Sequence, residues 1–159
     1  MSDPKPRTEA HLRRRLLAEF SVPSEPGNER MAMARVAEAI GELEVRGENL
    51  ERLKTAVAEA TMNAMEHGNK YRAEVPVEVM VLVEDQDLMV RITDRGSGPP
   101  PAKAGVVPDL EAKLGGSQTA RGWGMFLISR MVDEVHVSGN PDHHTVELVL
   151  RLEVGKDGN

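Results

Sequence analysis

Three things are scarce in this chain of 159 residues: it has no cysteine, its aromatic content is 3%, and it has no uninterrupted apolar run of membrane length. The absence of cysteine excludes a disulfide framework and thiolate chemistry. The lack of a long apolar run argues against a transmembrane helix, and the polar, proline-bearing start from Met1 to Glu9 has no signal-peptide core. We therefore expect a cytoplasmic protein that does not associate with a membrane.

An excess of basic charge is also missing. The formal net charge is -6 and the sequence pI is near 5.4. Binding to nucleic acid draws much of its affinity from neutralising phosphates, so this balance argues against a nucleic-acid partner. The one dense basic run, Arg13 to Arg15, is interpreted as a solvated N-terminal face.

The length is typical of one domain with a real core. Two-residue alternation predicts strands over 16–22, 75–84, 88–94, 135–137 and 145–152. Helical periodicity predicts three helices: one over 29–44, a second that ends at Gly68, and a third over 124–133. Gly47 is expected to close the first helix. Strands grouped mainly as hairpins, with helices between them, indicate an α+β two-layer sandwich: a mixed, mostly antiparallel sheet with helices on one face.

The chain is organised around the stretch from Glu59 to Asn69. Glu59, Asn63 and His67 recur every four positions, so on a straight α-helix successive members are rotated by only about 40° and form one row. That row flanks an apolar stripe and so lies beside a buried face, where polar groups are costly to desolvate without partners. The alternative interpretation is a solvated helix edge with an ordinary Gly-Asn stop.

Two further stretches add weight to this one. Asp94 continues the parity of the apolar side chains of its strand, and a carboxylate on an inward row is rare unless it is paired. It opens the run Asp94-Arg95-Gly96-Ser97-Gly98, and Arg121-Gly122-Trp123-Gly124 precedes an apolar helical run. His143 and His144 would point to opposite sides of an extended strand, so no metal site is expected there.

Together, the three stretches resemble the N, G1 and G2 boxes of the GHKL ATPase superfamily, in order and in approximate spacing, and the resemblance extends from about Leu16 to Leu152. Within that superfamily the chain is most similar to the small anti-sigma-factor serine/threonine-protein kinases. The resemblance implies the GHKL or Bergerat fold, with ATP and Mg²⁺ as cofactors. It also implies a domain over 15–153 with an ATP lid at 99–121, an N-terminal extension at 1–14 and a flexible tail at 154–159.

The same resemblance implies roles for individual residues. Asn63 matches the Mg²⁺-binding asparagine, Glu59 the general base, and Asp94 the aspartate that accepts a hydrogen bond from adenine. His67 is expected to have a structural role, and Trp123 departs from the aliphatic residue expected in its box. The remaining expected ATP-binding residues are Gly96, Gly98, Arg121, Gly122 and Gly124.

By resemblance, the chain is expected to phosphorylate a serine or threonine of a STAS-domain antagonist and to bind a sigma factor, in a partner-switching cycle. Relatives often dimerise, so a homodimer is also expected. Two alternatives stay open: a non-catalytic module in which ATP gates protein binding, and a plain ATPase without a protein acceptor.

Overall fold

The computed structural model describes residues 14–45, 47–96 and 120–152, with the backbone alone given for 120–122. Several predicted features lie outside the described residues. They are Gly98, the lid up to residue 119, the N-terminal extension except Arg14, and the tail at 154–159.

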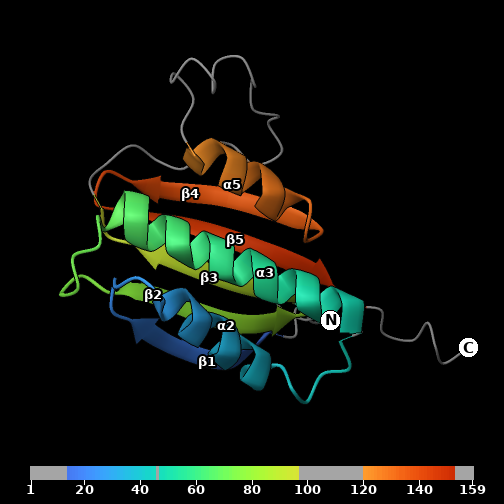
Figure 1. Cartoon of the computed structure of the whole chain (residues 1–159). Coiled ribbons are helices and arrows are strands. Elements are labelled where there is room, and N and C mark those ends of the chain that lie inside the picture. Colours follow the sequence, from blue (N-terminus) through green and yellow to red (C-terminus); the bar gives the residue numbers. More distant parts are fainter. Residues whose placement is uncertain (1–13, 46, 97–119, 153–159) are drawn as a thin grey trace, which may run out of the picture.

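One five-stranded sheet, in the order β1-β2-β3-β5-β4, forms one layer of the molecule (Figure 1). Each strand pairs with its neighbours in antiparallel register, where the sequence predicted a mixed, mostly antiparallel sheet. Hairpins join β2 to β3 and β4 to β5, as the alternation of their residues predicted. The strands are β1 (Arg14–Val22), β2 (Val77–Glu84), β3 (Asp87–Asp94), β4 (Glu134–Asn140) and β5 (His143–Arg151).

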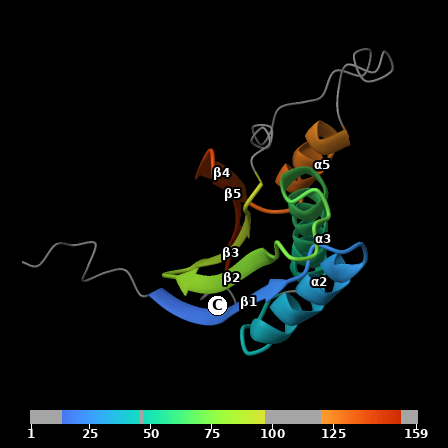
Figure 2. The same cartoon turned by 90° about the vertical axis from the view of Figure 1, so that its left-hand side faces the viewer.

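The helices form the second layer, all on one face of the sheet (Figure 2). The predicted α+β two-layer class is confirmed. No helix in the described part of the chain is long and apolar enough to span a membrane. The helical elements are α2 (Asn28–Ala39), α3 (Gly47–Asn63), the short π-helix η1 (Ala64–Gly68) and α5 (Ala120–Ser129).

The core lies between these layers and is built mainly from aliphatic side chains. The predicted stripe of α3 faces the sheet, and Leu53, Val57 and Ala60 on it are at most 1% exposed. Full burial of a side chain such as Leu53 stabilises a fold by about 1.5–3 kcal/mol. The stripe therefore fixes α3 on the sheet and determines the side on which its polar row lies.

The helix boundaries depart from the sequence prediction in two places. The first helix ends at Ala39 instead of continuing to residue 44, and Gly47 begins α3 instead of closing the helix before it. At Gly41 the amide bonds to the carbonyl of Glu38, three residues back, which tightens the last turn. Glycine is a poor helix former, so the chain leaves the helix here.

The last helix is displaced as well. It begins at Ala120, four positions before the predicted start, so Gly122 and Gly124 lie inside its first turns and do not precede it. The buried face of this helix contains Met125 and Ile128, which are at most 1% exposed, whereas Leu127 is 48% exposed.

Candidate functional site

The organising stretch consists of two kinds of helix. From Ala64 to Gly68 the turn widens to a π-helix, and the amide of Asn69 reaches the carbonyl of Ala64 at 2.8 Å. A π-turn accommodates an extra residue compared with an α-turn and is frequent at functional sites. His67 therefore lies in the π-turn, whereas Glu59 and Asn63, both on α3, are one α-turn apart.

Glu59 and Asn63 meet Gly124 of α5. A methyl group built on Gly124 would lie 2.9 Å from Glu59 Oε2 and 3.0 Å from Asn63 Nδ2. Both distances are shorter than an ordinary contact of a carbon atom, so no larger residue fits between the two side chains and α5 without a shift. The structure thus brings one member of the third stretch against two members of the first.

The environment of Glu59 is acidic and partly buried. Burial is the largest cause that raises the pKa of Glu59 above its ordinary value, and the nearby carboxylates of Glu66 and Glu29 raise it further. A carboxylate whose charge is disfavoured in this way accepts a proton more readily, as a general base must.

The Asn63 side chain is also buried in a position where it can bind a polar group. Its residue is 6% exposed, and its Nδ2 atom has no hydrogen-bond partner among the described residues. A buried amide in this state costs free energy, so the position favours a polar ligand over a solvated helix edge. Within the same described part of the chain, no group of three or more His, Cys, Asp or Glu side chains is arranged to hold a metal.

Asp94 lies at the other end of the π-helix, where β3 ends. A methyl group built on Gly68 would lie 2.3 Å from Asp94 Cγ, and one built on Gly96 would lie 1.7 Å from the carbonyl oxygen of Gly68. Asp94 is 3% exposed. The carboxylate therefore sits against bare backbone on one side, and both glycines are required by close approach.

Asn69 holds this end of the site together, although its sequence signal suggested only a helix stop. It is fully buried. Its Nδ2 atom donates to Ser24 Oγ and to the carbonyl of Val75, and its Oδ1 atom accepts the amide of Arg95 at 2.8 Å. These bonds join three segments next to Asp94. They also support the backbone that follows Asn69, where Lys70 and Tyr71 both have φ of 55°.

His144 is a second residue whose contact in the site was not predicted from the sequence. It faces Asp94 across the β3–β5 pairing, and its Nδ1 atom lies 3.2 Å from Asp94 Oδ1. The only signal in the sequence was the alternation of β5, which places His144 on the inward row with Val146 and Leu148. A correct strand register would have been needed to find the contact.

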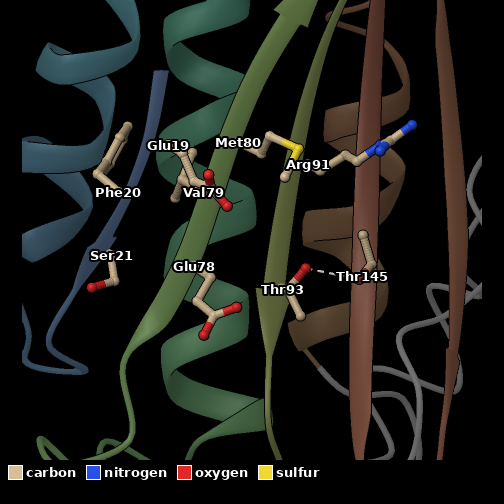
Figure 3. A pocket seen from close by; sticks show the side chains of 9 residues that line it. All are labelled: Glu19, Phe20, Ser21, Glu78, Val79, Met80, Arg91, Thr93 and Thr145. Atoms are coloured by element: carbon tan, nitrogen blue, oxygen red, sulfur yellow. Dashed lines mark hydrogen bonds between the residues drawn. The ribbon is translucent and has the colours of Figure 1, made fainter. Parts of the chain in front are cut away.

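A separate hollow of about 380 Å³ lies on the face of the sheet away from the helices (Figure 3). Thr93 and Thr145, neighbours on β3 and β5 in its wall, share a hydrogen bond of 2.8 Å. Since the core side chains of β2 and β3 point to the helices, this hollow is separated by the sheet from Glu59, Asn63 and Asp94. Its other lining residues are Glu19, Phe20, Ser21, Glu78, Val79, Met80 and Arg91.

The structure places the remaining predicted residues only in part. Arg121 and Gly122 lie in the first turn of α5, where helix amides lack intrahelical partners and the dipole favours an anion. Gly124 is one residue too far into the helix to offer a free amide, so its close contact with Glu59 and Asn63 is the reason for glycine there.

Comparison with known families identifies the class of domain. The family model for the histidine kinase-like ATPase domain matches residues 22–150. The chain therefore belongs to the histidine kinase-like ATPase domain family, the GHKL superfamily that its three boxes resemble, and ATP is the nucleotide that this class of domain uses.

Its relatives narrow the class. The anti-sigma F factor of Pasteuria penetrans is 30% identical over 153 residues, covering 91% of this chain and 95% of the relative. The anti-sigma F factor of Bacillus subtilis is 30% identical over 145 residues, with 87% and 92% covered. The resemblance to the anti-sigma-factor branch of the superfamily is thus confirmed.

Two solved structures share the fold. One contains the RsbU and RsbW domains of a Mycobacterium tuberculosis protein; the TM-score is 0.61 at 18% identity, and the match covers 85% of this chain and 32% of that one. The other is the SiaB–SiaC complex from Pseudomonas aeruginosa, with a TM-score of 0.61 at 14% identity and coverage of 86% and 90%.

Proposed function

We propose that this chain is an ATP-dependent protein serine/threonine kinase that acts as an anti-sigma factor and phosphorylates a STAS-domain antagonist in a partner-switching cycle. The observation that carries the proposal is the meeting of Glu59 and Asn63 at Gly124. It puts a carboxylate of raised pKa, suited to take a proton, next to a buried amide whose Nδ2 atom has no partner among the described residues, and phosphoryl transfer depends mainly on such positioning.

Glu59 is the general base in this proposal. Its carboxylate accepts the proton of the serine or threonine hydroxyl of the acceptor, and the hydroxyl oxygen then forms the new bond to phosphorus. Bound ATP with Mg²⁺ supplies the γ-phosphoryl group, and ADP leaves. The raised pKa of Glu59 makes proton acceptance more favourable than it would be for a solvated glutamate.

Asn63 is the residue that fits the metal. Mg²⁺ prefers oxygen ligands and keeps several waters, so one side-chain carbonyl can suffice when phosphate oxygens complete the shell. Asn63 is 6% exposed and has one such carbonyl, Oδ1, so the side chain fits this role.

Asp94 and Gly96 are the adenine end of the proposed site. An ionised carboxylate only accepts hydrogen bonds, so it suits the exocyclic amine of adenine. Close packing of Gly68 and Gly96 around the carboxylate leaves little freedom for it to turn away. In the same proposal, the amides of Arg121 and Gly122 and the glycine at 98 contribute to phosphate binding, and the lid extends over 99–121.

The sigma factor and the STAS-domain antagonist are proposed as partners from the similarity of the chain to known proteins. The similarity to anti-sigma F factors over most of both chains supports a sigma factor as one partner. The fold is shared with a structure that contains RsbU and RsbW domains and with the SiaB–SiaC complex. This shared fold supports the proposal that the chain binds protein partners. We include a homodimer and a single domain over 15–153 in the proposal.

The direct test is transfer of label from γ-³²P-ATP to a STAS-domain protein of the same organism, followed by identification of the labelled amino acid. Phosphoserine or phosphothreonine is expected with the wild-type chain, and loss of at least a hundredfold in rate with Glu59→Gln. Glu51→Gln is the matched control, because Glu51 lies two turns earlier on α3 with a side chain that is 71% exposed.

The same variants separate this function from the alternatives. A non-catalytic ATP-gated module would bind ATP and exchange partners equally well with Glu59 or Gln at position 59. A plain ATPase would release phosphate at the same rate with and without the STAS-domain protein. Either result would contradict the kinase proposal.

A further inference from the structure

The pairing of β3 with β5 ends with Asp94 opposite His144. Their side chains are 4% and 5% exposed, respectively, and His144 Nδ1 lies 3.2 Å from Asp94 Oδ1. A buried imidazole facing a buried carboxylate is costly unless the two are hydrogen-bonded. With Asp94 as the acceptor, Nδ1 of His144 is the donor of this bond.

The same oxygen of Asp94 receives a second bond. The amide of Gly96 donates to Asp94 Oδ1 at 3.0 Å. Two donors on Oδ1 fix the rotation of the carboxylate, and Gly68 packs against Cγ and both oxygens, since a methyl group built on it would lie 2.3 Å from Cγ, 2.5 Å from Oδ2 and 2.6 Å from Oδ1. Among the described residues, no hydrogen bond reaches Oδ2 of Asp94.

We propose that His144 is a positioning residue that determines nucleotide specificity: with the Gly96 amide it holds Oδ1 of Asp94, so that Oδ2 is the atom presented to the exocyclic amine of adenine. The inference rests on the proposed function, in which Asp94 reads adenine. His144 itself does not contact the base in this arrangement and acts through Asp94 alone.

Fixing the carboxylate matters because a free one can serve either purine. Adenine offers an amine at its 6-position, where guanine has a carbonyl acceptor. A carboxylate that could rotate or shift would instead accept from the ring N–H and the 2-amine of guanine. With Oδ1 held by His144 and Gly96, the carboxylate can meet the base in one orientation only. In that orientation the carbonyl oxygen of guanine would face Oδ2 of Asp94, and two acceptors cannot form a hydrogen bond.

Two substitutions at the same position test this idea. In His144→Asn, the amide nitrogen lies near the place of Nδ1 and can donate to Asp94, whereas in His144→Gln it lies one bond further out, near the place of Nε2. Dissociation constants for ATP and GTP are measured by calorimetry, and melting temperature is measured in parallel. His143→Asn is the control, because His143 is the neighbouring, half-buried residue on the other side of β5.

The Asn variant should keep ATP affinity within about threefold of wild type, as should the control. The Gln variant should bind ATP about tenfold more weakly, as expected for the loss of one bond to a charged group, with a smaller loss for GTP. The ratio of the two constants should therefore narrow only in the Gln variant. Equal ATP-to-GTP ratios in folded Asn and Gln variants would overturn the inference.

A measurement on the wild-type chain does not depend on how the variants fold. Nitrogen-15 NMR of the imidazole rings, assigned by comparison with His144→Asn, should show a proton on Nδ1 of His144. A neutral ring protonated on Nε2 alone would overturn the inference. Asp94→Asn distinguishes the two proposals: if it leaves ATP binding unchanged, the proposed adenine site is wrong, whereas if it abolishes ATP selectivity while both His144 variants resemble wild type, only the role of His144 is wrong.

Discussion

Gly124→Ala should separate activity from stability. The added methyl would lie 2.9 Å from Glu59 Oε2 and 3.0 Å from Asn63 Nδ2, so each polar atom must move by roughly half an ångström to restore ordinary contact. Reactive groups displaced on this scale lose rate steeply, with about 10²-fold for a full ångström. We therefore expect transfer to the acceptor to fall by about 10- to 100-fold.

The stability of the same variant should not fall with its activity. Alanine is a better helix former than glycine by about 1 kcal/mol, which offsets the cost of moving two side chains at the edge of α3. The melting temperature should therefore stay within a few degrees of wild type. Transfer rates and thermal unfolding of one preparation give both numbers.

Gly47→Ala is the matched control for this prediction. Gly47 is likewise a helical glycine, the first residue of α3, but nothing lies within 4 Å of a methyl group built on it. Its transfer rate should equal that of wild type. If Gly124→Ala were as active as Gly47→Ala, the close approach of α5 to Glu59 and Asn63 would have no functional meaning, and the reasoning would be refuted.

Three further predictions concern stability. Burial and neighbouring carboxylates raise the pKa of Glu59 in the folded state, so the folded chain binds a proton at Glu59 more tightly than the unfolded chain does. The stabilisation from this proton is complete below the pKa of the unfolded state and is lost as the pH rises through the pKa of the folded state. Glu59→Gln should thus be more stable than wild type at pH 7 and gain nothing near pH 4, and chemical denaturation showing the opposite trend would contradict the assigned cause. Asn69→Ala leaves the carbonyl of Val75 and the amide of Arg95 without their bonds and should cost about 2–4 kcal/mol in urea unfolding; a loss below about 1 kcal/mol would mean that water replaces the side chain. Leu53→Ala removes a fully buried side chain and should cost about 2–5 kcal/mol in the same assay, against less than about 0.5 kcal/mol for the exposed Glu51→Gln.

Much of the fold could be predicted because it depends on short-range patterns. The alternation of β2, β3 and β5 and the apolar stripe of α3 gave the strands, the turn between β2 and β3, and the buried face of the main helix. Boundaries were harder to predict. Apolar residues continue past Ala39 at helical spacing, so periodicity extended the first helix to residue 44, whereas the structure ends it at Ala39 near Gly41.

The end of α3 was predicted less well for another physical reason. A spacing of four residues implies a straight α-helix only if each turn has the same width. The π-turn from Ala64 to Gly68 changes that width, and it is stabilised by contacts with β3 and by the bonds of Asn69 to distant segments. A local pattern carries no record of such contacts, so the π-turn that contains His67 could not be predicted from spacing alone.

The sequence by itself determined the kinds of groups in this protein: a carboxylate and an amide one turn apart on an amphipathic helix, an acid ending an inward row, and glycines where backbone must come close. Their order in the chain also sufficed to indicate the family. Only the tertiary structure decided which of these groups meet. Gly124 reaches Glu59 and Asn63 because α5 packs on α3, and His144 reaches Asp94 because β5 pairs with β3 in one register. These contacts join residues 50 or more positions apart, and such pairings are determined by the packing of whole layers and not by the preferences of neighbouring residues.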